Sequence, residues 1–185
     1  RPTRVRIALF TGGGSNPGMD LTAKRWPLAR YQELARRLIH ELDAQILLVG
    51  GPGDVALNQQ LEDALGAHKS AVINLTGKTS LGELAAQLEQ CALFIGNDSS
   101  PMHLAAAVNI PVIAIFGPTS PQEYGPFPPD DPRHIAIWRH PSGQPCFYLG
   151  KMQACAHCVC MPSVTVDDVW RAVQQLIPSH RTEIR

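Results

Sequence analysis

Short apolar runs alternate with amphipathic segments along most of the chain. Runs rich in Val, Ile, Leu and Phe are typical of strands buried on both faces, whereas the longer segments carry apolar residues at helical spacing. The pattern predicts strands at Val5–Phe10, Gln45–Val49, Val72–Leu75, Ala92–Ile95 and Val112–Phe116, and helices at Leu28–Leu42, Val55–Leu65, Ser80–Gln90 and Met102–Val108. This succession of βα repeats indicates an α/β fold, a Rossmann-like, doubly wound parallel sheet in one domain spanning 1–185 with its core at 5–121.

Prolines crowd the chain after Phe116 and recur from Pro118 to Pro132. Proline has no amide hydrogen and does not fit the interior of a helix or a central strand. The stretch 117–133 is therefore predicted to be a connection without helix or central strand, either an ordered loop or a linker.

The last part of the chain, 134–185, combines a weak strand, a cysteine-rich loop and a terminal helix. The strand is predicted at His134–Trp138 and the helix at Val166–Leu176. Thr165 is the expected N-cap of this helix, and two aspartates in its first turn complement the helix dipole.

Composition narrows the class of protein. The chain has 185 residues, of which 44% are hydrophobic, and this is enough for one domain with its own core. Its 16 basic and 16 acidic residues cancel, so no overall field favours nucleic acid or an anionic membrane surface. No apolar run approaches the roughly 20 residues of a membrane-spanning helix, and the first residues do not resemble a signal sequence. We therefore expect a cytoplasmic protein that binds any anion locally.

Four of the five cysteines crowd together near the end of the chain, at Cys146, Cys155, Cys158 and Cys160. Such a cluster differs from the even scatter of a secreted disulfide framework. With His157 the four thiols supply enough soft ligands for tetrahedral zinc, and Cys155 and Cys158 have the usual spacing of a ligand pair. The second pair is irregular, so a structural zinc, free thiols and a local disulfide all stay open.

Glycine-rich turns follow the first two predicted strands. In open α/β sheets, ligands bind beyond the carboxyl ends of the strands, where helix N-termini present unpaired N–H groups. Thr11 and Gly12 open the first turn, where missing side chains let a ligand approach the backbone. Asp54 closes the second turn within reach of a ribose hydroxyl, and Lys24 precedes the first helix, where a cation can meet a phosphate. A plain turn or a solvated side chain is the alternative at each place.

The densest polar segment follows the fourth strand and runs from Asp98 to His103. Ser99 or Ser100 can cap the next helix, whose free N–H groups and dipole form an anion site for a diphosphate. Asp98 and His103 are then placed to touch the attached sugar or phosphate. An ordinary capped helix with a turn Asp and a half-buried His is the equal alternative. The turn Gly117–Pro121 after the fifth strand fits a phosphate or sugar contact, or a simple loop.

Five segments together resemble glycosyltransferase family 9, the heptosyltransferases of lipopolysaccharide core assembly. They occur in the family's order between Val5 and Pro121. The segments are Lys24–Pro27, Leu48–Asp54, Asn74–Leu81, Asn97–Ala106 and Pro111–Thr119. The resemblance implies a GT-B architecture of two facing Rossmann-like domains, of which the C-terminal one binds a nucleotide-diphosphate sugar, typically ADP-heptose. This chain matches the C-terminal domain.

The resemblance also implies roles for individual residues. Lys24 would pair with the diphosphate, and the turn Asp98–His103 would hold phosphate and sugar. The turn Thr79–Leu81 would lie against the base, and Asp54 or a neighbour would hold the ribose. The reaction implied is an inverting transfer in which an acceptor hydroxyl displaces the nucleotide diphosphate. No cofactor is required for it, and the chain has no Asp-x-Asp pair for a divalent metal.

Two departures from the family affect this interpretation. The family usually has Gly where this chain has Ser100, and the added side chain narrows the phosphate approach or changes the donor. The N-terminal domain of such enzymes supplies the acceptor site and the proposed catalytic carboxylate, so no residue here inherits that role. We expect this fragment alone to bind nucleotide without transferring sugar. The full enzyme would use a lipid-linked saccharide acceptor and work in the cytoplasm at the inner membrane.

Two other classes of function stay open from the residues alone. A dinucleotide-dependent oxidoreductase domain would need a glycine fingerprint directly after the first strand, leading into the first helix, and an acidic residue closing the second strand. Here a long stretch separates Gly14 from Trp26, and the second strand ends in glycines. A non-enzymatic module that binds a nucleotide or zinc and regulates a partner has no such sequence mark.

Overall fold

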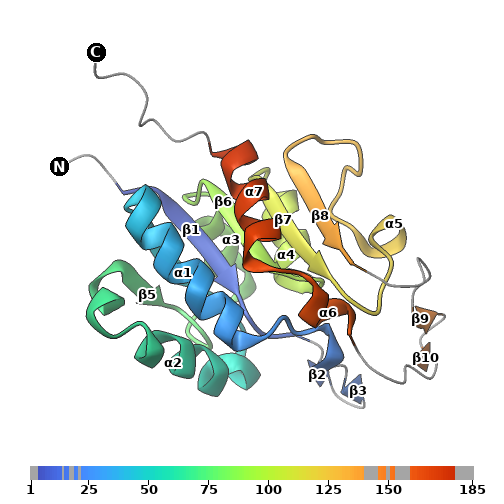
Figure 1. Cartoon of the computed structure of the whole chain (residues 1–185), viewed down its shortest axis with the longest axis horizontal. Helices are drawn as coiled ribbons and strands as arrows, with labels where there is room; N and C mark the ends of the chain where they lie inside the picture. The colour runs from blue at the N-terminus through green and yellow to red at the C-terminus, as the bar shows by residue number, and fades with distance from the viewer. Residues whose placement is uncertain are drawn as a thin grey trace.

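Six parallel strands form a sheet through the centre of the molecule in the order β5-β4-β1-β6-β7-β8 (Figure 1). The computed structural model describes residues 4–13, 15–16, 19–20, 22–139, 146–148, 151–152 and 159–177. The strands of the sheet are β1 (Arg6–Phe10), β4 (Gln45–Leu48), β5 (Val72–Asn74), β6 (Leu93–Asn97), β7 (Val112–Phe116) and β8 (His134–Trp138). Every neighbouring pair is parallel, so all carboxyl ends meet at one edge.

Helices cover both faces of this sheet, with α1 and α7 on one face and α3 and α4 on the other (Figure 1). The helices are α1 (Leu28–Leu42), α2 (Val55–Ala64), α3 (Leu81–Leu88), α4 (Ser100–Ala107), α5 (Pro121–Tyr124), α6 (Cys160–Ser163) and α7 (Val166–Leu176), with 3-10 turns η1 (Thr22–Lys24), η2 (Pro52–Asp54) and η3 (Gly66–Ala71). Two short antiparallel pairs complete the described elements: β2 (Ser15–Asn16) with β3 (Met19–Asp20), and β9 (Phe147–Tyr148) with β10 (Lys151–Met152). The α/β fold and the parallel sheet predicted from the sequence are confirmed.

The alternation of side chains along each strand explains why both faces are covered. Ile7 and Leu9 of β1 point toward α1 and α7, whereas Ala8 and Phe10 point toward α3 and α4. Successive side chains of a strand face opposite sides, so an apolar run without polar interruptions needs helices on both.

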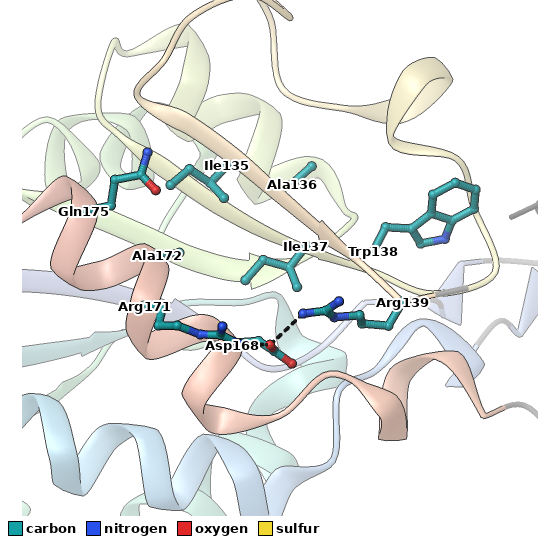
Figure 2. Close-up of a pocket in the computed structure, with 9 residues that line it drawn as sticks. All are labelled: Ile135, Ala136, Ile137, Trp138, Arg139, Asp168, Arg171, Ala172 and Gln175. Atoms are coloured by element: carbon teal, nitrogen blue, oxygen red, sulfur yellow. Dashed lines mark hydrogen bonds and ion pairs between the residues drawn. The ribbon is translucent and has the colours of Figure 1, made fainter. Parts of the chain in front are cut away.

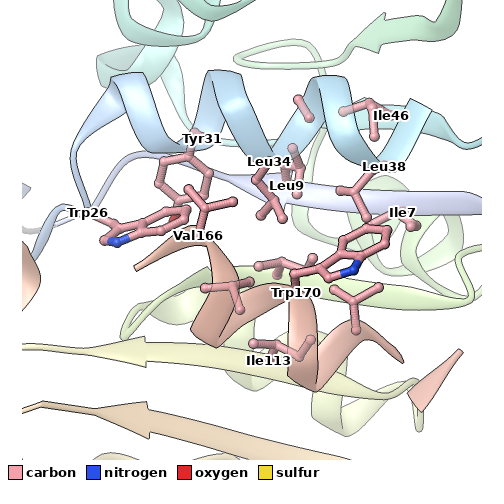
Figure 3. Close-up of a cluster of buried hydrophobic side chains, with 14 of the residues drawn as sticks. Ile7, Leu9, Trp26, Tyr31, Leu34, Leu38, Ile46, Ile113, Val166 and Trp170 are labelled. Carbon is pink, nitrogen blue, oxygen red and sulfur yellow. The ribbon is translucent and has the colours of Figure 1, made fainter. Parts of the chain in front are cut away.

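Trp170 and Tyr31 anchor the core between α1, α7 and the sheet (Figure 3). Tyr31 is fully buried and meets the Trp26 ring edge-on, with 4.9 Å between ring centroids. The indole N–H of Trp26 donates to the carbonyl of Val164 at 2.9 Å and so ties the start of α1 to the segment before α7. Burying an aromatic side chain of this size contributes about 2–3 kcal/mol.

The N-cap predicted for the terminal helix is confirmed. Thr165 accepts a hydrogen bond from the amide of Asp168, and the Asp168 carboxylate accepts one from the amide of Thr165. This reciprocal pair is a capping box, which satisfies two amides that the first turn of a helix leaves unpaired.

One prediction about the proline-rich stretch is wrong, because it contains the short helix α5. Ser120 is the N-cap of α5, and its hydroxyl accepts a hydrogen bond from the amide of Gln122 at 3.2 Å. Pro121 occupies the first helical position, where a missing amide hydrogen costs nothing. The prolines therefore limit the length of the helix without preventing it.

β8 extends the sheet beyond the predicted βα repeats and forms its edge. Between β8 and α7 lies a hollow of about 380 Å³, lined by Ile135 and Ile137 and rimmed by Arg139 and Arg171, which both contact Asp168 (Figure 2).

Among the helices in the described ranges, none combines the length and apolar character needed to cross a bilayer.

Candidate functional site

The strand order reverses between β1 and β6, and we call the carboxyl edge of the sheet at this switch point the crevice, after the place where ligands of open α/β sheets bind. The chain leaves β1 for β4 on one side, and it leaves β6 for β7 on the other. The two connections therefore diverge, and ligands of open α/β sheets bind at such a point. The turns after β1, β4, β6 and β7 all reach this edge, where β2, β3 and α6 also lie (Figure 1).

Asn97, the last residue of β6, organises the crevice. Its side chain is fully buried, and Nδ2 donates to the carbonyls of Thr11 at 3.1 Å and Gly12 at 2.9 Å. Oδ1 accepts from the amide of Trp26 at 3.1 Å and from the hydroxyl of Tyr31 at 3.0 Å. Burial raises the pKa of Tyr31 well above its ordinary value, so the phenol remains a donor. One amide thus fixes the glycine turn relative to the start of α1.

Lys24 and Asp98, which the sequence places 74 positions apart, meet in this crevice. Lys24 Nζ lies 2.7 Å from Asp98 Oδ2, and the two side chains are only 15% and 5% exposed. The same oxygen accepts a hydrogen bond from the buried hydroxyl of Thr119 at 2.7 Å. The predicted cation and the predicted acidic turn therefore form one cluster, with Thr119 as its third member.

Two aromatic rings border the Lys24 ammonium. Nζ lies 5.8 Å from the ring centroids of both Tyr124, in α5, and Phe147, in β9. Phe147 is held in place by a hydrogen bond from its amide to the carbonyl of Pro118 at 2.9 Å. Aromatic faces attract a cation at this range and exclude water from it. The ammonium is therefore partly desolvated, which strengthens its attraction to any anion.

The N-terminus of α4 presents backbone donors beside this cluster. Ser99 is the N-cap residue, with extended backbone, and its hydroxyl makes no capping bond. Within the described ranges, the amides of Ser99 and Ser100 donate to no protein acceptor. Pro101 follows and has no amide hydrogen. Free amides at the positive end of a helix form a site suited to phosphate.

Asp54 joins the turn after β4 to the turn after β1. Its carboxylate accepts from the amide of Gly51 at 2.9 Å and from the amide of Gly13 at 3.4 Å. A Cβ at Gly12 would lie 1.9 Å from Asp54 Oδ1, so only glycine fits there. Asp54 is thus a turn residue, which was the alternative to a ribose contact in the sequence analysis. It also lies beside the glycine turn at the crevice. Its contact with a ribose stays a prediction.

The two basic residues before α1 have separate tasks. Arg25 Nε donates to the carbonyl of Gly13 at 2.8 Å and holds the glycine turn. Lys24, by contrast, donates to the carboxylate of Asp98. Of the two, Lys24 is thus the cation beside the start of α4, and its contact with a phosphate stays a prediction.

The predicted base-binding turn, Thr79–Leu81, lies at the far end of the same edge. The amide of Gly77 donates to the carbonyl of Gly50 at 2.9 Å, which places the turn after β5 beside the turn after β4. Leu81 is 70% exposed, and Val55 at the start of α2 is 45% exposed. Both apolar side chains lie in elements that begin just after this edge, and Val55 was not singled out in the sequence.

Three predicted residues are placed less favourably for direct contact. The Thr11 hydroxyl is buried and donates to Asn58 Oδ1 at 2.6 Å, in a network that includes Thr76. His103 is exposed in the first turn of α4, whereas the ordinary capped helix that was the equal alternative had it half-buried. Ser100 is exposed at the start of the same helix, so its side chain can narrow the approach to the amides. Their roles stay predictions.

The cysteine cluster falls largely on residues that the structure does not describe. Cys155, His157 and Cys158 lie outside the described residues, whereas Cys146 is half-buried and Cys160 is buried in α6. Among the described residues, no group of three or more His, Cys, Asp or Glu is arranged to hold a metal ion. The zinc hypothesis therefore remains a prediction.

Asn97, Thr119, Tyr124 and Phe147 were not given roles from the sequence. Asn97 carried one available signal, because a polar residue at the end of an otherwise apolar strand must find buried partners. Thr119 stood in a turn noted only for its hydroxyls. Tyr124 and Phe147 lie far from Lys24 in sequence, so only the folded chain brings them together.

Comparisons with known proteins agree with this geometry. The family profile of glycosyltransferase family 9 (heptosyltransferase) matches residues 13–157. The chain is 41% identical to lipooligosaccharide heptosyltransferase 2 of Haemophilus influenzae over 111 residues, 59% of this chain and 32% of the relative. It is 39% identical to lipopolysaccharide heptosyltransferase 2 of Escherichia coli over 110 residues, 58% of this chain and 31% of the relative. The aligned part of the chain thus spans about a third of the length of each of these relatives.

A solved structure extends the similarity to nearly the whole chain. The structure of E. coli ADP-heptose lipopolysaccharide heptosyltransferase II superposes with a TM-score of 0.73 and 29% sequence identity. The superposition covers 95% of this chain and 47% of the E. coli chain. The fold and the sequence therefore point to the same group of proteins.

Proposed function

Because this chain belongs to glycosyltransferase family 9, the heptosyltransferase family, we propose that it is the donor-binding half of such an enzyme. Its ligand would be a nucleotide-diphosphate sugar, bound along the carboxyl edge of the sheet. In support, the chain corresponds to 47% of the E. coli structure that it resembles. The acceptor-binding half and the catalytic base would be supplied by another domain.

The order of the strands is the observation that carries this proposal. From β5 to β7 the edge presents the exposed Leu81 after β5, Asp54 after β4, and then the end of β6, where Asp98 pairs with Lys24. The amides of Ser99 and Ser100, which donate to no acceptor in the described ranges, follow Asp98 at that same strand end. These are an apolar surface, a carboxylate, and an anion site that shares its strand end with a charged polar pocket. A nucleotide sugar presents its base, ribose, diphosphate and sugar in that order. Four strand intervals of about 4.8 Å give about 19 Å for an extended ligand.

The chemistry of the site suits departure of a nucleotide diphosphate. When an acceptor hydroxyl attacks the anomeric carbon, negative charge grows on the leaving phosphate. The Lys24 ammonium and the amides of Ser99 and Ser100 would lie near the place where that charge develops. Such donors stabilise the transition state more than the ground state, and one of them is commonly worth about 3–4 kcal/mol. This chain's own residues would thereby neutralise the leaving group without a cofactor.

We take ADP-heptose as the donor. The E. coli structure at 29% identity is that of an ADP-heptose heptosyltransferase, and the two curated relatives above are heptosyltransferases as well. The general base would lie in the acceptor-binding domain, which is why no residue of this chain is assigned that role. The acceptor would be a lipid-linked saccharide.

Isothermal titration calorimetry and a transfer assay on this chain test the proposal together. We expect the chain to bind ADP and ADP-heptose and to transfer no sugar, because base catalysis from a positioned carboxylate, worth about 10²–10⁴-fold, is missing. A saturating ligand should also raise thermal stability, by about 2.7 kcal/mol at 100 times its dissociation constant. Heat signals with NAD in place of ADP, or sugar transfer by the chain alone, would contradict the proposal.

A further inference from the structure

We propose that Thr119 is a positioning residue for Asp98 and that it sets how much more tightly a nucleotide-diphosphate sugar binds than the bare nucleotide diphosphate. The inference rests on the proposed function and adds to it a residue that selects for the sugar. The residues involved lie on the side of the crevice nearest β7, where Thr119 of the turn Gly117–Pro121 contacts Asp98.

The geometry divides the two oxygens of Asp98. Oδ2 accepts from Lys24 Nζ at 2.7 Å and from Thr119 Oγ1 at 2.7 Å. A carboxylate oxygen has two lone pairs, so Oδ2 is saturated. Within the described part of the chain, Oδ1 accepts no hydrogen bond. The carboxylate is thus held in place through Oδ2, and Oδ1 is left to accept a hydrogen bond from a ligand.

Thr119 can hold Asp98 in one orientation because it is itself fixed. Its side chain is fully buried, and a β-branched side chain has few alternative rotamers. The turn that carries it continues β7 and leads into α5, whose N-cap is Ser120. On the other side, the amide of Asp98 donates to the carbonyl of Ile115 at 3.3 Å. The donor and the acceptor therefore both sit on the ends of paired strands, β6 and β7.

Lys24 cannot perform this positioning alone once the donor is bound. Among the described residues, its ammonium is the cation paired with Asp98, and the diphosphate would compete for it with Asp98. The Thr119 hydroxyl carries a single donor hydrogen and is fully buried. It therefore remains on Oδ2 in the liganded state and keeps Oδ1 turned toward the sugar. Sugar hydroxyls are hydrogen-bond donors, and a carboxylate oxygen is their strongest acceptor.

The test measures ADP and ADP-heptose affinity for wild type and Thr119→Val by calorimetry. Valine keeps the shape of threonine and removes the hydroxyl. We expect ADP affinity to change less than about 2-fold, and ADP-heptose affinity to fall about 10-fold, the equivalent of one hydrogen bond to a charged group. Thr119→Ser should restore the wild-type ratio of the two affinities.

Thr76→Val is the matched control, because Thr76 is another buried hydroxyl near this edge, bonded to Asn58 and not to Asp98. It should lower stability without moving the ratio. If Thr119→Val does not fold, Thr119→Cys, with a weak thiol donor of similar size, supplies the same comparison. Equal weakening of both ligands, or no change in the ratio, would overturn the inference. Failure of wild type to bind ADP would overturn the proposed function and this inference with it.

Discussion

At the scale of single residues, the site depends on competition for one ammonium group. Lys24 is paired with Asp98 at 2.7 Å in a partly desolvated position. A bound diphosphate would therefore compete with the Asp98 carboxylate for the ammonium. Breaking a buried pair by removing one partner leaves the other charge uncompensated. Substitutions at the two positions should therefore have opposite effects on diphosphate binding.

Replacing Lys24 with methionine should weaken ADP binding by about 10- to 100-fold, because it removes the charged donor and leaves the Asp98 carboxylate to repel the diphosphate. Calorimetry on folded protein measures the effect. Lys69→Met is the matched control, since Lys69 forms an exposed ion pair with Asp63 at 2.6 Å, far along the chain. Equal losses at both lysines would show that Lys24 has no specific role.

Asp98→Asn should leave ADP binding unchanged or strengthen it several-fold, because the neutral amide no longer competes for the ammonium. Its Oδ1 can still accept from both Lys24 and Thr119, so the local fold should survive. The additional affinity for ADP-heptose should be lost, since the group then turned toward the sugar is the amide NH2, which donates hydrogen bonds and cannot accept one. Titrations with the two ligands separate these effects. A loss of ADP affinity as large as that of Lys24→Met would refute this account of Asp98.

At the scale of elements, the strands and long helices follow from local pattern, whereas the site does not. α1, β7, β8 and α7 have the bounds predicted from the sequence, because each has a clear apolar period and, for α7, a capping residue. The turns at the carboxyl edge are set by partners far along the chain. The Asn97 amide bonded to Gly12 spans 85 positions, and no local propensity encodes such a contact.

The cap of α7 gives a prediction for stability against pH. Burial raises the pKa of Asp168, but hydrogen bonds from Thr165 and Arg139 lower it by more, and the pKa is held at about 2. A carboxyl whose folded pKa lies below its ordinary value of 3.8 stabilises the fold above that pH. This stabilisation is lost as the pH falls toward 2.

Wild type should therefore be more stable than Asp168→Asn near neutral pH, and the difference should shrink between about pH 4 and pH 2. Urea unfolding at a series of pH values measures it. Asp167→Asn, at the exposed neighbouring position in the same first turn, should cost less at neutral pH. If the stability difference between wild type and Asp168→Asn stays constant down to pH 2, protonation of the Asp168 carboxylate does not cause the loss of stability in acid.

At the scale of the whole molecule, the strand order brings candidate site residues from distant parts of the sequence to one edge of the sheet. The predicted residues after β4, β5 and β6 are scattered in sequence from Asp54 to Ser100, yet the sheet places their turns side by side. The general rule for open α/β sheets located this edge from the sequence. On the β7 side the sequence singled out the turn Gly117–Pro121 but not the two aromatic residues beside Lys24. Tyr124 lies in a short helix within the proline-rich stretch, and Phe147 lies in a segment with no apolar period.

The central claim is that one diphosphate occupies the crevice between β1 and β6. Titrating the isotope-labelled chain with ADP and following its backbone amides by NMR tests this most directly. We predict that the largest shifts fall on Gly12, Gly13, Ser99 and Ser100, in the turns that border the crevice. Shifts confined to the hollow between β8 and α7, or no shifts at saturating ADP, would contradict it.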